Sequence, residues 1–224
     1  MIIIAVIVLL LLFILPNVWA KWVLQRYSRP RDDYPGSGGE LARHLVERLG
    51  LEGVTVEVTE HGDHYDPTSR KVRLSAENFE GRSLTAVTVA AHEVGHAIQH
   101  HHGYQPLLMR TRLVGIAQSA EKLGAGLMMA APLLFLLART PGGTVLMVMA
   151  AVLSFGTAAL VHLITLPVEF DASYQRALPL LKGYLPPYDM PAARHLLTAC
   201  AFTYVAASLA SILSLGRWLV ILRR

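Results

Sequence analysis

A seven-residue run of this chain, AHEVGHA at Ala91–Ala97, holds two histidines and a glutamate at a spacing that suits metal chemistry. Residues four apart lie on one face of a helix, so His92 and His96 can offer imidazole nitrogens to a single zinc ion. Glu93 adjoins the first of these histidines, where its carboxylate can take a proton from a zinc-activated water. The run therefore predicts a hydrolytic zinc centre with two ligands and a general base.

A catalytic zinc ion usually has three protein ligands, and the sequence offers two candidates for the third. His102 lies ten residues after His92, but the longer motif with that spacing needs a glycine where Gln99 stands, because the chain must turn sharply there. On a straight helix, these two histidines would lie about 15 Å apart. The other candidate, Glu169, follows an apolar block, and Pro167 can begin a helix with Glu169 in its first turn. An acidic residue there also stabilises a helix start, but beside an incomplete HExxH we expect Glu169 to be the ligand.

The composition indicates a membrane protein. Hydrophobic residues make up 53% of the 224 and charged residues 16%, with a mean hydropathy of +0.42, whereas soluble domains carry roughly 25% charged residues. The net charge of +4 is small, and the arginines lie beside apolar blocks, which indicates headgroup contacts and no nucleic-acid surface. A single cysteine, Cys200, excludes an internal disulfide and a cysteine-based zinc site.

Long apolar blocks divide the chain, and about 20 apolar residues are enough to cross a bilayer. The sequence therefore predicts a mainly α, integral membrane helical protein with about four transmembrane helices and a small α+β, zincin-like catalytic region. The expected divisions are an N-terminal transmembrane helix at 1–24, the catalytic region with the HExxH helix at 25–112, a transmembrane hairpin at 113–168, the third-ligand helix and loop at 169–195, and a C-terminal transmembrane or interfacial helix at 196–224.

Within the catalytic region, short elements precede the histidines. Residues 40–49 have the pattern of an amphipathic helix, and 54–58 and 71–74 that of short strands. The intervening 61–67 has turn composition, so we expect an ordinary hairpin; alternatively, the second strand could pair with an extended peptide at a sheet edge. Ser83 is the expected N-cap of the histidine helix.

Lysine and arginine near the apolar blocks indicate the orientation. Their excess on the catalytic side places that region in the cytosol, with both termini outside the plasma membrane of a multi-pass protein. The basic C-terminus conflicts with this topology unless the last block lies in the membrane interface.

Four segments carry a family resemblance: HYDP at 64–67, VRLS at 72–75, VAAHEVGHAIQ at 89–99 and LPVEFDAS at 166–173. In this order they resemble the YugP-type membrane-bound neutral zinc metallopeptidases, over about 34–178. The resemblance implies a bacterial integral-membrane endopeptidase of the glutamate-zincin kind, similar in plan to the HtpX and CAAX-processing proteases. It also implies that His92, His96 and Glu169 bind Zn2+ and that Glu93 is the catalytic base.

The residues around this centre leave two questions open. HtpX-like proteins place an aspartate four residues after the glutamate ligand, but Ser173 stands there and Asp171 lies nearer, so either could orient the histidines. A further group must stabilise the oxyanion, and the candidates are Tyr174, Tyr65, His162 and Arg176.

The function predicted is that of a membrane-embedded zinc endopeptidase, which hydrolyses peptide bonds of membrane or misfolded proteins. Its expected partners are a polypeptide substrate, the lipid bilayer and optionally a membrane protein partner, whose identity the sequence does not give; no nucleic acid is expected. The alternative is a non-enzymatic membrane scaffold or partner subunit with a vestigial or structural metal site, which would have no use for Glu93. An intramembrane site-2-type protease is disfavoured, because Arg82 and His100 flank the HExxH segment too closely for it to span.

Overall fold

The computed structural model describes residues 15–116, 119, 122–123, 126, 161 and 164–202. In chain order, the bounded elements are α2 (Gly38–Arg48), β1 (Thr55–Thr59), β2 (His64–Asp66), β3 (Lys71–Ser75), α3 (Ala76–Glu80), α4 (Leu84–His101), the π-helix η1 (Asp171–Ala177), α7 (Leu178–Lys182) and the 3-10 turn η2 (Pro187–Asp189). Helical residues also fill 15–26, 105–116, 164–170 and 190–202. The prediction of a mainly α protein with a small sheet is confirmed.

Three strands form the sheet in the order β1-β3-β2. β1 runs parallel to β3, while β2 pairs antiparallel with it through Tyr65 opposite Val72. The expected hairpin of 54–58 with 71–74 is wrong, because these two strands pair in parallel. The hairpin instead joins β2 to β3, and it turns at Arg70, whose φ is 54°. Because β3 is the central strand, the alternative in which 71–74 pairs with a peptide at a sheet edge is wrong.

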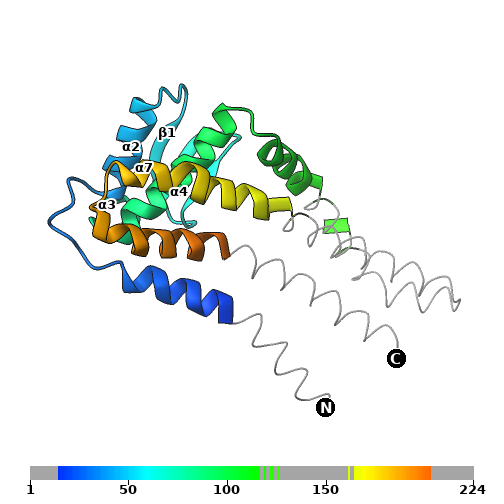
Figure 1. Cartoon of the computed structure of the whole chain (residues 1–224). Coiled ribbons are helices and arrows are strands. Elements are labelled where there is room, and N and C mark those ends of the chain that lie inside the picture. The colour runs from blue at the N-terminus through cyan, green and yellow to red at the C-terminus, as the bar shows by residue number, and fades with distance from the viewer. Residues whose placement is uncertain are drawn as a thin grey trace, which may run out of the picture.

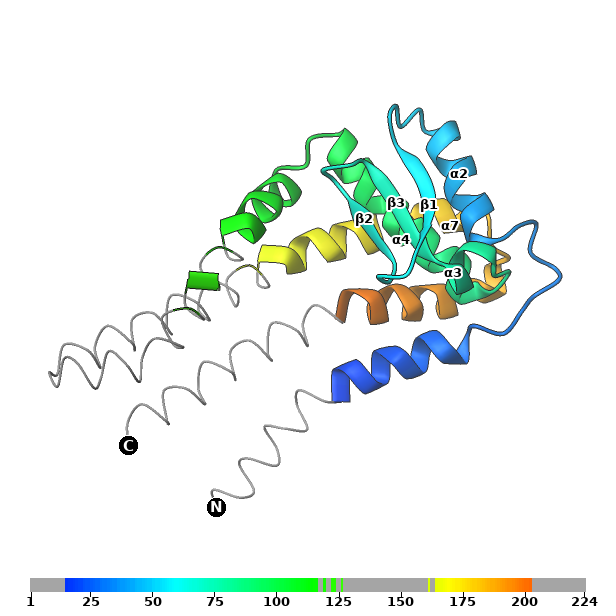
Figure 2. The same ribbon diagram turned by 180° about the vertical axis from the view of Figure 1, so that it is seen from behind.

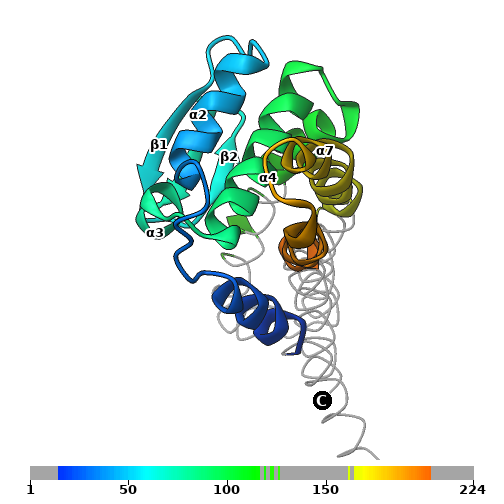
Figure 3. The same ribbon diagram turned by 60° about the vertical axis from the view of Figure 1, so that its left-hand side comes forward.

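Helix α4 is the centre of the fold. Its N-cap is Ser83, as expected, with the side chain accepting from the Ala86 amide, and all residues from Leu84 to Gln99 are buried. α2 begins with a capping box formed by Ser37 and Glu40. Figure 2 shows the strands lying across α4, and Figure 3 shows α2 and α4 on the same side of the sheet.

Two helices far apart in sequence lie side by side below this core. Helix 15–26, blue in Figure 1, runs along helix 190–202, drawn in orange. The Trp19 ring lies 5.4 Å from the His195 ring and 5.9 Å from the Phe202 ring. These contacts attach the segment before α2 to the last described helix.

The expected fold of about four transmembrane helices requires correction. Among the residues that the structure describes, no helix combines the length and the apolar character needed to cross a bilayer. The physical reason is the length and the charge of these helices. Helices 15–26 and 105–116 are short and carry charged residues, Lys21 and Arg26 in the first and Arg110 and Arg112 in the second. Helix α4 has 18 residues, but these include ionisable histidines and a glutamate. Most of the stretches predicted to span, within 1–24, 113–168 and 196–224, lie outside the described residues.

Candidate metal centre

Three buried side chains meet between α4 and the segment 164–170. Glu169 Oε2 lies 3.3 Å from His92 Nε2 and 3.2 Å from His96 Nε2, and one ligand atom of each residue lies within 4.8 Å of the others. The Glu169 side chain is 0% exposed. The structure therefore brings together the three residues that the sequence predicted as ligands, although 73 residues separate Glu169 from His96.

The segment that carries Glu169 differs from the expected one. Residues 164–170 are continuously helical through Pro167 and pass directly into η1. Glu169 therefore does not lie in the first turn of a new helix, and stabilising a helix start does not explain its burial. π-helical turns often occur at functional sites, and this one follows Glu169 within two residues.

Gly95 permits the close approach of α4 and η1. A Cβ atom at this position would lie 2.7 Å from the carbonyl oxygen of Ala172. The glycine between the two histidines of HEVGH thus lets η1 pack directly against the histidine helix.

His96 is oriented by the side-chain amide of Gln99. The Gln99 Nε2 donates to the carbonyl of Val168 at 2.8 Å and to Asp171 Oδ2 at 2.7 Å. Both partners are acceptors, so the amide orientation is fixed, and its oxygen accepts from His96 Nδ1 at 3.0 Å. In the neutral imidazole, the proton is therefore on Nδ1 and the Nε2 lone pair faces Glu169.

His92 is oriented in the same sense by Ser173. The Ser173 hydroxyl donates to the carbonyl of Leu197 at 3.3 Å and lies 3.1 Å from His92 Nδ1. A hydroxyl that donates elsewhere accepts here, which places the His92 proton on Nδ1 as well. Both residues that the sequence offered for orienting the histidines therefore take part. Ser173 contacts His92 directly, whereas Asp171 is linked to His96 through Gln99.

This arrangement fits a zinc ion. With both imidazoles neutral, two Nε2 lone pairs and a carboxylate oxygen point toward one position. A cation bound at that position would be stabilised by all three atoms. Two histidines and a glutamate are an established donor set of catalytic zinc. Such outer hydrogen bonds to ligand histidines fix their tautomer.

The pKa values of His96 and Glu169 are shifted by their proximity to each other. Burial lowers the pKa of His96, but the nearby Glu169 carboxylate raises it more, so the net shift is upward. Burial raises the pKa of Glu169, yet the imidazoles outweigh it and hold that pKa well below its usual range.

Glu93 lies on the same helix with its carboxyl group buried. Burial raises its pKa, partly countered by His92 and His96. A carboxylate with a raised pKa is better suited to accept and return a proton near neutral pH.

Arg110 is a residue of this centre that the sequence did not point to. Its Nη1 lies 3.4 Å from Glu169 Oε1, an oxygen that is buried and accepts no hydrogen bond of good geometry. The contact between Arg110 and Glu169 is therefore an ion pair without the alignment of a hydrogen bond. Arg110 lies on helix 105–116, nine residues beyond the end of α4, and no spacing rule connects it to the histidines.

A cavity of about 320 Å3 adjoins the metal centre. Its lining includes His96 and Arg110, which both contact Glu169, and Tyr65 of β2. Of the four oxyanion candidates, Tyr65 is brought to this cavity, with its hydroxyl 2.8 Å from His100 Nδ1.

The other candidates have different neighbours. Tyr174 bonds to Thr198, and Arg176 bonds to Asp171 and to His102, while His162 lies outside the described residues. His102 is the C-cap of α4 and does not belong to the group of potential ligands among the described residues.

Comparison with known proteins agrees with this class of site. The model of a family described as "Putative neutral zinc metallopeptidase" matches residues 2–223, so the chain belongs to that family. It is also 36% identical over 212 residues to the "Putative membrane protease YugP" of Bacillus subtilis (strain 168), and the match covers 92% of this chain and 91% of the relative. The resemblance to YugP-type proteins is thereby confirmed. No solved structure gives a significant match.

Proposed function

We propose that this protein is a zinc-dependent endopeptidase in which His92, His96 and Glu169 hold the metal and Glu93 is the general base. The observation that carries the proposal is the convergence of two imidazole nitrogens and a carboxylate oxygen beside a buried glutamate. A bound zinc ion supplies a lowered pKa for its water and a polarised scissile carbonyl. Membership of the zinc metallopeptidase family supports the same reaction.

The residues of the chain have separate tasks in this reaction. Glu93 accepts the proton of the attacking water and returns it to the leaving amine; its burial-raised pKa makes its carboxylate a stronger base for the first of these steps. Gln99 and Ser173 hold the two imidazoles with Nε2 toward the metal position. Tyr65, at the neighbouring cavity, is the best placed of the four candidates to donate to the oxyanion.

We further propose that the enzyme acts at the plasma membrane, with its catalytic region on the cytosolic side, on membrane or misfolded proteins. The name of the Bacillus relative, a membrane protease, supports the location. The distribution of lysine and arginine along the sequence supports the side.

Glu93→Gln tests this function against the alternative of a scaffold with a structural metal site. The expected result is that purified Glu93→Gln protein keeps about one zinc per chain but loses cleavage of unfolded casein by roughly 100-fold or more. Zinc content by mass spectrometry and product release by chromatography measure the two effects. Equal cleavage by wild type and variant would reject the mechanism, and wild-type protein with zinc but without cleavage would favour the scaffold.

A further inference from the structure

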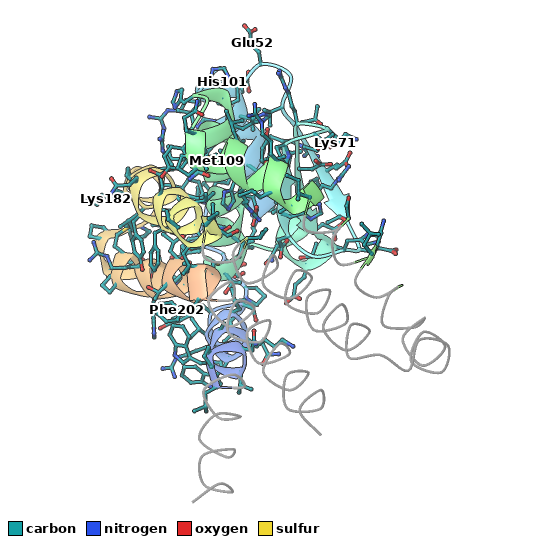
Figure 4. The ribbon with its side chains drawn as sticks, turned by 90° about the vertical axis from the view of Figure 1, so that its right-hand side faces the viewer. Glu52, Lys71, His101, Met109, Lys182 and Phe202 are labelled. Carbon is teal, nitrogen blue, oxygen red and sulfur yellow. The ribbon has the colours of Figure 1, made fainter. Side chains whose placement is uncertain are left out.

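The cavity beside His96 is formed by two segments that are distant in sequence. Tyr65, Pro67 and Thr68, from β2 and the turn after it, make one wall, and helix 105–116 makes the other. Figure 4 views the molecule from the side of this helix, which carries the labelled Met109. Because the candidate ligand His96 lines the cavity, a group bound in it lies close to the metal position.

The walls of this cavity are suited to an apolar group. Leu107, Val114 and Pro67 present aliphatic surface. The charged lining residue Arg110 lies 3.4 Å from the carboxylate of Glu169, which balances its charge. An acidic group in the cavity would therefore gain little attraction from Arg110, because Glu169 already neutralises it.

The size of the cavity is sufficient for one large side chain. Its volume of about 320 Å3 lies at the lower end of the roughly 300–1,000 Å3 found for small-molecule sites. This space can hold a leucine or phenylalanine side chain.

We infer that this cavity is the specificity pocket of the enzyme and that it binds a large apolar side chain of the residue flanking the scissile bond. The inference rests on the proposed endopeptidase function. It adds a substrate class, peptides with leucine or phenylalanine beside the cleaved bond, which neither the HExxH motif nor the metal ligands define.

Gly115 offers a way to close the pocket without touching the metal centre. It lines the cavity, and no described atom lies within 4 Å of a Cβ built on it. A leucine at this position therefore has room for its side chain at the lining of the pocket, where we expect it to reduce the space open to a substrate. The adjacent Ile116 is 59% exposed and does not line the cavity, so Ile116→Leu is a matched control on the same helix.

The test compares zinc-loaded wild type, Gly115→Leu and Ile116→Leu on peptides with leucine, phenylalanine, alanine or aspartate at each position flanking the cleaved bond. For wild type and Ile116→Leu, kcat/KM should favour leucine or phenylalanine over alanine by roughly tenfold or more, since pocket contacts discriminate by about this factor. For Gly115→Leu this ratio should fall toward one. Cleavage without the preference, a preference for aspartate, or a preference that Gly115→Leu leaves intact would overturn the inference while the endopeptidase function stands.

A binding measurement separates failure of the pocket from failure of the catalytic proposal. Fluorescence titration of the same peptides into zinc-loaded Glu93→Gln, with and without Gly115→Leu, requires no turnover. If wild type cleaves none of the peptides, selective binding of the leucine and phenylalanine peptides that Gly115→Leu abolishes would support the pocket alone. Absence of selective binding would overturn the pocket as well.

Discussion

At the scale of single residues, the unusual feature is an amide where a carboxylate often orients a ligand histidine. Gln99 accepts from His96 Nδ1 and donates to Val168 and Asp171. All of its hydrogen bonds fix one orientation, and this orientation determines which imidazole nitrogen faces the metal position. The side chain is 0% exposed, so no water competes for these bonds.

Gln99→Leu should therefore weaken zinc binding. Removal of an outer partner of a metal ligand typically lowers affinity by about 10- to 100-fold, and this change also leaves Nδ1 of His96 without an acceptor. Competition with a chromophoric chelator measures the affinity. Gln99→Glu is the matched variant, because it retains an acceptor for His96, and it should bind zinc more tightly than Gln99→Leu. Equal affinities of wild type and Gln99→Leu would contradict this role.

At the scale of secondary structure, the contact between α4 and η1 holds the ligands in register. Gly95 is the point of closest approach, and Ser173 and Asp171 come from the helix on the other side. A short distance between these helices is therefore a condition for the metal centre.

Gly95→Ala should separate the two helices. The added Cβ would lie 2.7 Å from the Ala172 carbonyl, and overpacking of this kind typically costs about 1–3 kcal/mol of stability. Urea unfolding and zinc content measure the two consequences. The control is Gly115→Ala, also in a helix, whose Cβ meets no described atom within 4 Å and which should be neutral or stabilising by up to about 1 kcal/mol. A Gly95→Ala protein as stable and as zinc-rich as wild type would show that α4 and η1 do not need this approach.

The turn between β2 and β3 makes a pH-dependent contribution. The hydroxyl of Ser69, the turn amides and Arg73 lower the pKa of Asp66 from 3.8 to about 2. A pKa lowered by folding stabilises the protein above pH 4, and this stabilisation is lost as the pH falls through about 2.

Asp66→Asn should remove that contribution. At pH 7 the variant should be less stable by about 1 kcal/mol, because it loses charged acceptors that are partly solvent-screened. The difference from wild type should shrink between pH 4 and pH 2, as measured by urea unfolding at each pH. A difference that stays constant down to pH 2 would show that the Asp66 charge does not contribute.

At the scale of the whole molecule, features set by neighbouring residues were predictable from the sequence, whereas most contacts between distant segments were not. The pairing of His92 and His96 follows from the helical repeat alone, and Ser83 marks the helix start. The HYD strand was hidden in a stretch of turn residues, because it is held by its pairing with β3 and not by its own propensity.

The surroundings of Glu169 were likewise predictable only in part. Its role as third ligand was predicted because the zinc site needed one, but the expected helix start at Pro167 was wrong. Arg110 could not be predicted, because only the folded chain places it beside Glu169. The membrane spans were predicted from apolar blocks, whereas the described helices that adjoin these blocks carry charged residues.

Metal removal should affect the stability of the whole molecule. A ligand that binds only the folded state stabilises it by mass action, by about 4 kcal/mol at 1,000 times its Kd. Chelation should therefore lower the Tm of wild type, and added zinc should restore it. Glu93→Gln should show the same shift, because Glu93 is not a ligand in this account, and a Tm that does not respond to chelation in wild type would contradict a metal that bridges α4 and Glu169.

The zinc content of purified wild type, Glu169→Ala and His102→Ala tests the central assignment most directly. The structure predicts about one zinc per chain in wild type and in His102→Ala, because His102 lies at the end of α4 away from the centre. Glu169→Ala should lose most of its zinc while remaining folded by circular dichroism. Zinc retained in folded Glu169→Ala and lost from His102→Ala would contradict the account.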